Sequence, residues 1–297
     1  DHQAFFAQAK SVKPKVNVLY THQSMWAEKY LHVGHSQLEG RNIGASIKSA
    51  LSFYQAFHEI GISVGLGEMN EYDWNRANYH GEILVLANQF AISEENWDLL
   101  KSFVAKGGFL FLEGLSGMYN EHLFNRFQKS DKYADFLGAE VAEFLTVADA
   151  FELEFEGHSL PAHLWKGELL VSDKLTTFHR QTYGKGKVTW IPSSIGLGAR
   201  KSDFEPLANL LLEEMESHQT QDIGWKKYHP NMVVRRLQAN RDLVEIFINK
   251  SDVVQEIQIP VAGKRSIIFG NKDALSKKSF LTIFPEEVVV VLSEDFF

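Results

Sequence analysis

Two different spacings of apolar residues follow one another along the chain, and they divide it near residue 220. Between residues 16 and 219, short apolar runs alternate with stretches whose apolar residues recur every three or four positions. Such runs are typical of strands covered on both faces, and such stretches are typical of amphipathic helices. The predicted strands of this region are 16–20, 62–66, 83–87, 109–112 and, after a turn, the end of 183–192.

The predicted helices carry recognisable start and stop signals. Residues 45–60 place apolar side chains at helical steps and end before Gly61, a typical helix stop. Ser93 is expected to cap a second helix whose first turn contains Glu94 and Glu95, because acids are favoured at helix N-termini. A third helix is predicted at 204–215 and closes the region.

Two stretches of this region have a less regular pattern. Residues 21–42 show little periodicity and predict a loop with one helical turn. Residues 120–180 contain short strand-like runs at 150–155 and 169–171 and a helical candidate near 133–137. Strands and helices joined by short connectors indicate a doubly wound α/β domain.

The chain changes character after Gln219. Six strand candidates follow with turn residues between them and no helix signal, which predicts a small antiparallel β-sandwich. These candidates are 232–237, 243–249, 253–259, 265–269, 280–284 and 288–292. We therefore divide the chain into a connecting segment (1–15), an α/β domain (16–219) and an all-β sandwich domain (225–297).

Composition and charge narrow the functional classes. The net charge is −8, and the basic residues cluster only in pairs, so the chain is a poor candidate for binding nucleic acid. No apolar stretch is long enough to cross a bilayer. The absence of cysteine excludes thiol nucleophiles and thiolate metal sites, and it leaves bacterial cytoplasm and periplasm equally open. The start at Asp1, without Met or a leader, is interpreted as a mature or excised product.

Several segments of the α/β region read VNVLY with QSMW near the start, then VLANQFAIS, LKSFVAKGGFL, SGMYNE and YGKGKV. In order and spacing, these segments resemble the middle domain of glycoside hydrolase family 42 β-galactosidases. VRRLQ, followed by FIN, is similar to the start of the small β domain of that family. The resemblance covers most of the chain.

The resemblance implies a flavodoxin-like fold of the class I glutamine-amidotransferase type for the α/β domain, which mediates trimer formation in that family. It also implies that catalysis belongs to an upstream (β/α)₈ barrel carrying two glutamates. About 220 residues of α/β sequence cannot also contain a barrel of about 250 residues, so no catalytic residue is transferred to this chain. The expected partners are the barrel of a parent chain and further copies in a homo-oligomer, with carbohydrate as another candidate. No cofactor is expected.

Two weak candidates for catalysis follow the strand at 109–112. Ser116 is the hydroxyl nearest to the expected nucleophile elbow, but its surroundings do not match the Gly-x-Ser-x-Gly motif, and a packing turn is the preferred interpretation. Glu121 in the Asn120-Glu121 pair, like Glu71 after Asn70, superficially resembles the Asn-Glu acid of barrel glycosidases. That pair belongs at the end of a barrel strand, which this sequence does not contain.

His32 and His35 form the one spacing that suggests a metal ligand pair, with Glu39 nearby. Gly34 between them argues against a helix that would place both on one face. A histidine pair in a loop is a weak zinc signal, so an exposed loop or a contact between subunits is preferred and no metal is predicted.

Four aromatic residues are candidates for an interface or for sugar contact. They lie in predicted loops at strand ends, where α/β sheets bind ligands. Aromatic faces suit sugars, and aromatic residues equally anchor protein interfaces, which is the preferred interpretation. The four residues are Trp26, Tyr72, Trp74 and Tyr79.

Two functional hypotheses remain. The first is a non-catalytic accessory and oligomerisation region of a β-galactosidase-like glycoside hydrolase, inactive by itself. The second is a free-standing sugar-binding or weakly enzymatic protein with an amidotransferase-like fold that lacks the cysteine. The start without Met favours the first, and the substrate and linkage of the parent enzyme stay open.

Overall fold

The computed structural model describes residues 2–30, 44–126, 131–218, 224–225, 227–259, 264–276 and 280–296. The chain folds into two compact units, each built from separate segments. The α/β unit comprises Val16–Gln55 and Gly65–Thr220, and the β unit comprises Asp1–Lys15, Ala56–Val64 and Gln221–Phe297.

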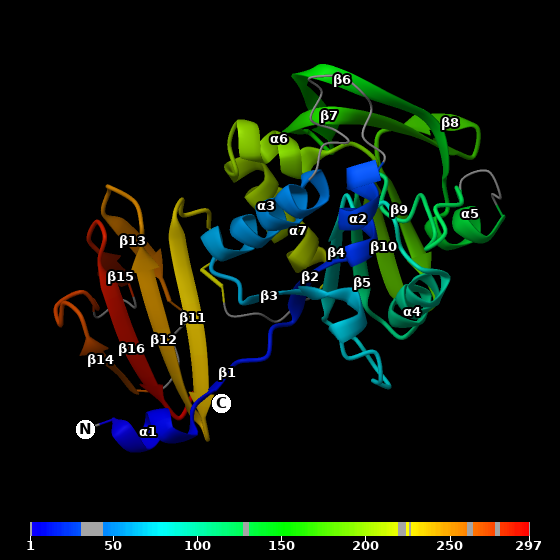
Figure 1. Ribbon diagram of the computed structural model, residues 1–297. Coiled ribbons are helices and arrows are strands. Elements are labelled where there is room, and N and C mark those ends of the chain that lie inside the picture. The colour runs from blue at the N-terminus through cyan, green and yellow to red at the C-terminus, as the bar shows by residue number, and fades with distance from the viewer. Residues whose placement is uncertain are drawn as a thin grey trace. The chain divides into compact units, whose positions relative to one another are not determined.

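A six-stranded sheet forms the centre of the α/β unit (Figure 1). Strands β2, β4, β5 and β10 are parallel, and β9 pairs antiparallel with β10 at one edge. Every residue of β4 and β5 is buried, which accounts for their continuous apolar runs. The strand order is β3 (Val64–Glu68), β2 (Val16–Tyr20), β4 (Ile83–Ala87), β5 (Phe109–Glu113), β10 (Gly186–Ile191), β9 (His179–Tyr183).

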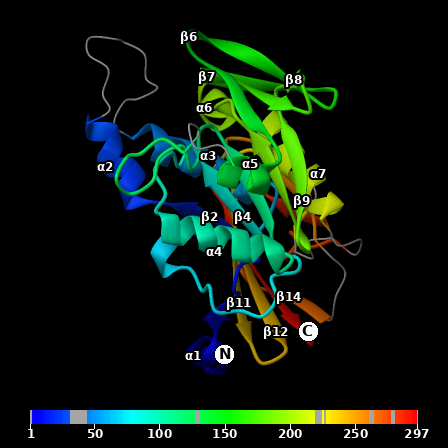
Figure 2. The ribbon, with the colours of Figure 1, turned by 90° about the vertical axis from the view of Figure 1, so that its right-hand side faces the viewer.

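Helices cover both faces of this sheet, and Figure 2 shows α4 in front of it. Helices α4 (Glu94–Ala105) and α5 (Asp131–Leu137) share a hydrophobic cluster with Leu110 and Leu112. The opposite face contacts α3 (Ala45–Glu59), where the rings of Phe53 and Phe111 lie 5.6 Å apart. On that face Phe109 stacks at 3.6 Å on His218, which directly follows α7 (Glu205–Ser217).

A long hairpin, here called the arm, forms a separate three-stranded sheet in the α/β unit. It consists of β6 (Glu140–Phe155), β7 (His158–Val171) and β8 (Lys174–Thr176), with β6 and β8 at its edges. Figure 1 shows the arm beside α6 (Ile195–Lys201). The approach is close, because a Cβ on Gly198 would lie 2.0 Å from the Pro161 carbonyl oxygen.

The β unit contains two antiparallel sheets. The larger has the order β1-β11-β12-β16-β14, and the smaller pairs β13 with β15. Helix α1 (Gln3–Gln8) and the short β1 (Lys10–Ser11) come from the N-terminal segment, and β1 pairs with β11. The other strands are β11 (Met232–Ala239), β12 (Asp242–Asn249), β13 (Gln255–Gln258), β14 (Lys264–Phe269), β15 (Phe280–Ile283) and β16 (Val288–Glu294).

A buried polar network ties residues 59–63 to the strands of the β unit. The Trp225 indole N–H donates to the Glu59 carbonyl oxygen at 3.1 Å. The Arg236 guanidinium donates to the Gly61 carbonyl at 2.9 Å and forms a buried ion pair with Glu245. The segment 56–64 is therefore an integral part of this unit, although it is remote from β11–β16 in sequence.

The predicted mixed α/β architecture is confirmed, and each of the six strand candidates beyond residue 230 corresponds to a strand. One expectation is wrong: residues 22–30, expected in a loop with one helical turn, form helix α2 (His22–Tyr30) directly after β2. The strand-like runs predicted at 150–155 and 169–171 do lie in strands, which extend further as the two long strands of the arm.

Candidate functional site

Buried polar groups fill the carboxyl edge of the six-stranded sheet, where doubly wound folds bind ligands. The Thr21 hydroxyl lies 2.7 Å from the Ser24 hydroxyl and 2.8 Å from the Ala91 carbonyl oxygen. The Gln89 side-chain oxygen accepts from the Thr21 backbone N–H at 2.9 Å. Since these groups satisfy one another, the network holds the start of α2 against the ends of β2 and β4.

The turn after β5 has the backbone geometry of an elbow but no nucleophile at its tip. Gly114 has φ +67°, and a Cβ there would lie 2.9 Å from the Asn88 side-chain oxygen. Ser116 is fully buried, and its hydroxyl accepts from the Gln89 N–H and lies 2.8 Å from the Glu113 carbonyl oxygen. The Ser116 side chain is thus packed inside the turn and bonded to its backbone and to that of Gln89.

Glu113, at the end of β5, is the buried carboxyl group beside this turn. Its two oxygens accept from the Gly196 N–H at 3.1 Å and from the Ser49 hydroxyl at 3.0 Å. Burial raises the pKa of Glu113 to about 8. No sequence pattern marks Glu113 as functional, because its position at the end of an apolar run is its one distinguishing feature.

Glu121 lies on the surface and is poorly placed for acid catalysis. Its carboxylate accepts from the Glu94 backbone N–H at 2.9 Å and lies 3.6 Å from His122. Hydrogen bonds from backbone N–H groups, its own and that of Glu94, hold the pKa of Glu121 below its usual range. A carboxyl group that is already ionised near neutral pH cannot donate the proton that glycoside cleavage requires.

Trp26 is the exposed member of the four aromatic candidates. It lies on α2 with 64% of its surface exposed, and its ring stacks on His22 at 5.6 Å and 19°. The helix below it is fixed, because the Glu28 carboxylate accepts from the backbone N–H groups of Gly44 and Ser46. Trp26 therefore presents a large apolar face from a rigid support.

The other three aromatic residues pack with the hydrophobic core of the α/β unit, Tyr79 within it and Tyr72 and Trp74 against it. Tyr79 is 1% exposed, and its ring packs on Phe103 at 4.8 Å. Trp74 is half-buried, packs against the same cluster and donates from its indole N–H to the Met69 carbonyl oxygen at 3.0 Å. Tyr72 is also half-buried and donates its hydroxyl to Glu82 at 2.9 Å.

The metal candidates His32 and His35 lie outside the described residues. Among the residues that are described, no group of three or more His, Asp or Glu side chains is arranged to hold a metal ion. A search of the same residues for a helix both long and apolar enough to span a bilayer also finds none.

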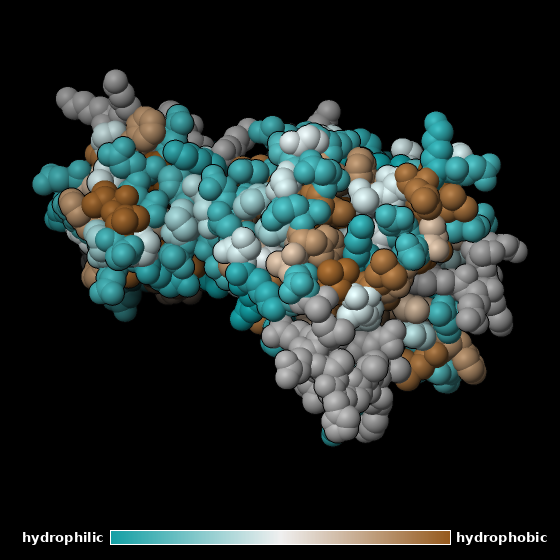
Figure 3. All heavy atoms as spheres, turned by 90° about the horizontal axis from the view of Figure 1, so that it is seen from above, coloured by the Kyte–Doolittle hydropathy of each residue, from teal (hydrophilic) through white to brown (hydrophobic). Residues whose placement is uncertain are grey.

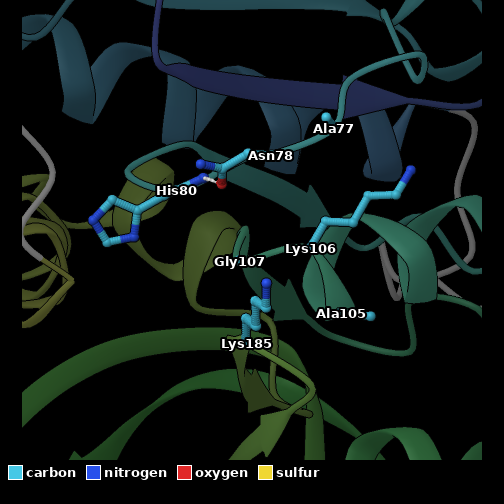
Figure 4. Close-up of a pocket in the computed structure, with 7 residues that line it drawn as sticks. All are labelled: Ala77, Asn78, His80, Ala105, Lys106, Gly107 and Lys185. Carbon is cyan, nitrogen blue, oxygen red and sulfur yellow. Dashed lines mark hydrogen bonds between the residues drawn. The ribbon is translucent and has the colours of Figure 1, made fainter.

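A basic groove at the opposite, amino edge of the sheet was not foreseen from the sequence. It consists of two adjoining hollows of about 370 and 220 Å³ that share His80, Gly107 and Lys185. In Figure 4, Lys185 extends toward Gly107, and His80 and Lys106 stand at the sides. Lys187 lines the second hollow. These side chains come from the loops that precede β4, β5 and β10 and from the start of β10, which is why no local sequence pattern revealed them.

The carbonyl groups at the C-terminal end of α4, beside this groove, do not need the lysine side chains as hydrogen-bond donors. The last four carbonyl groups of α4 all accept backbone N–H groups, at 2.9–3.1 Å, from Lys106, Gly108, Gly107 and Lys185 in turn. The acidic residue of the lining, Glu82, is buried and pairs with Arg76. Among the described residues, no carboxylate lies within 4.0 Å of the Lys185 or Lys187 amine. The groove is therefore a net positive surface.

Comparison with known proteins identifies the family. Residues 14–216 match the family described as the β-galactosidase trimerisation domain, and the chain belongs to it. A segment of 113 residues is 30% identical to β-galactosidase BbgII of Bifidobacterium bifidum. This match covers 38% of the present chain and 15% of BbgII.

Solved structures with a similar fold cover nearly the whole chain. Gan42B, a GH42 β-galactosidase from G. stearothermophilus, matches 95% of this chain with a TM-score of 0.72 and 18% identity. The β-galactosidase of Halorubrum lacusprofundi matches 98% with a TM-score of 0.73 and 15% identity. The chain spans 40% and 41% of those two proteins, so it corresponds to less than half of each.

Proposed function

We propose that the chain is a non-catalytic oligomerisation region of a β-galactosidase-like glycoside hydrolase, and that an upstream barrel carries out the catalysis. Membership of the trimerisation-domain family is the observation that carries this proposal. The buried state of Ser116 and the exposed, ionised state of Glu121 support it, because neither weak candidate is placed for glycoside cleavage.

We also propose that the α/β unit is flavodoxin-like and related to class I glutamine amidotransferases. The strand order β3-β2-β4-β5-β10 supports this, because it corresponds to the order 2-1-3-4-5 of flavodoxin-like sheets. Gly114, with positive φ directly after β5, stands where such a fold would carry its nucleophile. In this interpretation, the turn after β5 has the backbone shape of a nucleophile elbow but serves only the structure.

Trp26 is proposed as an anchor of the interface between copies. Monomeric soluble proteins rarely leave large apolar groups clustered on the surface, and tryptophan is enriched among residues that dominate binding energy. Phe124, 70% exposed in the segment that follows β5, lies at the same carboxyl edge of the sheet. The face in Figure 3 shows small hydrophobic groups among hydrophilic ones.

Trp26 and Trp74 provide a matched test of this proposal. Trp26→Ala should weaken self-association by about 2 kcal/mol or more, as for a hot-spot residue, and leave the unfolding temperature nearly unchanged. Trp74→Ala should instead lower the unfolding temperature, because that indole packs in its own core. Light scattering and thermal unfolding of both variants separate the two effects.

Two results would contradict the proposal. A wild-type chain that stays monomeric at high concentration would remove the oligomerisation role. Hydrolysis of nitrophenyl galactosides by the chain alone, lost on Glu121→Gln, would instead restore a catalytic role.

A further inference from the structure

We propose that the arm of one copy of the chain docks into the basic groove of a second copy, where Glu143 and Glu168 meet Lys185 and Lys187. The inference rests on the proposed oligomerisation and names the two surfaces that come together.

The arm carries an unfavourable arrangement of charge. Glu143 on β6 lies directly opposite Glu168 on β7 in the antiparallel register. Side chains at directly opposed positions share one face of the sheet about 5 Å apart, and like charges there are destabilising. Within the described part of the chain, no Lys, Arg or His nitrogen lies within 4.0 Å of either carboxylate. A cationic partner would offset this repulsion.

The remainder of β6 is acidic as well. Its sixteen residues include five acids and no Lys or Arg. Glu140 and Glu154 are both exposed, and β6 is an edge strand of its sheet. Acidic side chains discourage strands from adding to an open edge, which is the general explanation for them. That explanation does not account for Glu168, which lies on the central strand.

The basic groove complements the arm. Lys185 and Lys187 are exposed at its rim, and the helix end behind them already has its carbonyl groups paired with backbone N–H groups. Two lysines facing two glutamates form an arrangement of opposite charge that fixes register and speeds encounter. The chain as a whole is acidic, with a net charge of −8, so a positive groove reduces the repulsion that an approaching acidic copy meets.

The positions of the arm and the basic groove are compatible with a closed ring of three subunits. A three-fold assembly of identical subunits needs two different surfaces on each copy, because a self-complementary patch forms a two-fold dimer. The arm packs near the carboxyl end of β10, where a Cβ on Gly167 would lie 2.5 Å from the Pro192 Cβ. The groove is at the amino ends of β4, β5 and β10. One copy can therefore use both surfaces at once.

Charge reversal with rescue tests the pairing. Lys185→Glu with Lys187→Glu, or Glu143→Lys with Glu168→Lys, should each raise the dissociation constant at least about tenfold in sedimentation velocity. Combining all four reversals should restore most of the association. The wild-type assembly should also weaken as salt rises from about 0.05 to about 0.5 M. As a control, Lys250→Glu with Lys272→Glu on the β unit changes the net charge by the same amount as Lys185→Glu with Lys187→Glu. This control should have little effect on the dissociation constant.

Neutral substitutions distinguish a docking role from a structural one. Glu143→Gln with Glu168→Gln removes the cross-strand repulsion, so the unfolding temperature should rise while association weakens. If Glu143 and Glu168 served only the fold, this substitution would not raise the unfolding temperature and weaken association at the same time.

Three outcomes would overturn the inference. If the assembly forms and no reversal changes it, the docking is wrong while the proposed oligomerisation stands. If the groove reversal weakens association but the arm reversal does not, the groove binds a different anion. If the wild-type chain never associates, the inference fails together with the proposed function.

Discussion

Each unit of the molecule buries a glutamate with no exposed surface, and the two units accommodate it in opposite ways. In the α/β unit, Glu113 has a hydroxyl and a backbone N–H as partners, and burial raises its pKa to about 8. In the β unit, Glu245 lies directly across the sheet from Arg236, with their closest atoms 2.9 Å apart.

The difference shows that a buried carboxyl group needs either a cation or a proton. A charge without a partner is too costly in an apolar interior, so the group either changes its pKa or acquires a counter-ion. The α/β unit adopts the first solution and the β unit adopts the second. The two units should therefore respond differently to mutation and to pH.

Removing the cation should have the largest effect. Arg236→Met leaves the Glu245 charge buried and also removes the hydrogen bonds to Gly61 and Ser63. We expect the free energy of unfolding of the β unit to fall by about 3–5 kcal/mol, as for other broken buried pairs. Urea unfolding at neutral pH, followed by hydrogen exchange of the backbone amides of β11 and β12, measures it.

Removing both charges provides the control for Arg236→Met. The double variant Arg236→Met with Glu245→Leu should recover much of the loss, because apolar pairs often replace buried ion pairs at little cost. A double variant no more stable than Arg236→Met would show that the hydrogen bonds to segment 56–64 dominate.

Replacing the protonated carboxyl group should have a smaller effect that depends on pH. The pKa of Glu113 in the folded chain is above its ordinary value of 4.5, so its contribution to stability is complete below pH 4.5 and is lost as pH rises through about 8. Glu113→Gln cannot ionise. Relative to wild type, we expect it to gain about 1–3 kcal/mol of unfolding free energy between about pH 5 and about pH 8.

The comparison of Glu113→Gln with wild type is made by thermal unfolding across that pH range. A constant difference between the two proteins would mean that Glu113 is ionised in the folded chain. The two units would then differ less than their hydrogen bonds suggest.

The smallest expected effect concerns a single hydroxyl. Ser49→Ala removes the hydrogen bond to Glu113 and should lower the free energy of unfolding by about 1 kcal/mol. Ser52→Ala, in the same helix, removes a hydroxyl that bonds to the Lys48 carbonyl one turn earlier and should cost less. Equal losses in denaturant unfolding would indicate that Ser49 has no special role beside Glu113.

Local patterns in the sequence predicted the elements that depend on local signals. Ser93 caps α4 as expected, with its hydroxyl accepting from the Asn96 N–H at 3.2 Å. The continuous runs of β4 and β5 identified strands buried on both faces. Helix α2 was missed because it has few apolar residues, and the contacts of Thr21, Ser24 and Glu28 with distant segments hold it in place.

Features that depend on distant residues were not predicted. Trp74 and Tyr79 were interpreted as interface or sugar-contact candidates because their neighbours in sequence are polar, yet Phe103 and other residues of the core lie beside them. The arm was read as short runs because its exposed strand alternates only in part and contains two irregularities of register. The groove joins segments that are separated by more than a hundred residues, so charge clustering along the sequence could not show it.

The assembly of the β unit from three segments has a consequence for synthesis. A chain emerging from the ribosome releases β1 and the Glu59 turn long before β11–β16 exist, whereas the segments of the α/β unit are complete earlier. Domains generally fold as units during translation, and closing long loops costs entropy. Strands β11–β16 must therefore return to segments that were translated well before them, and those segments lack their partners until the strands have been made.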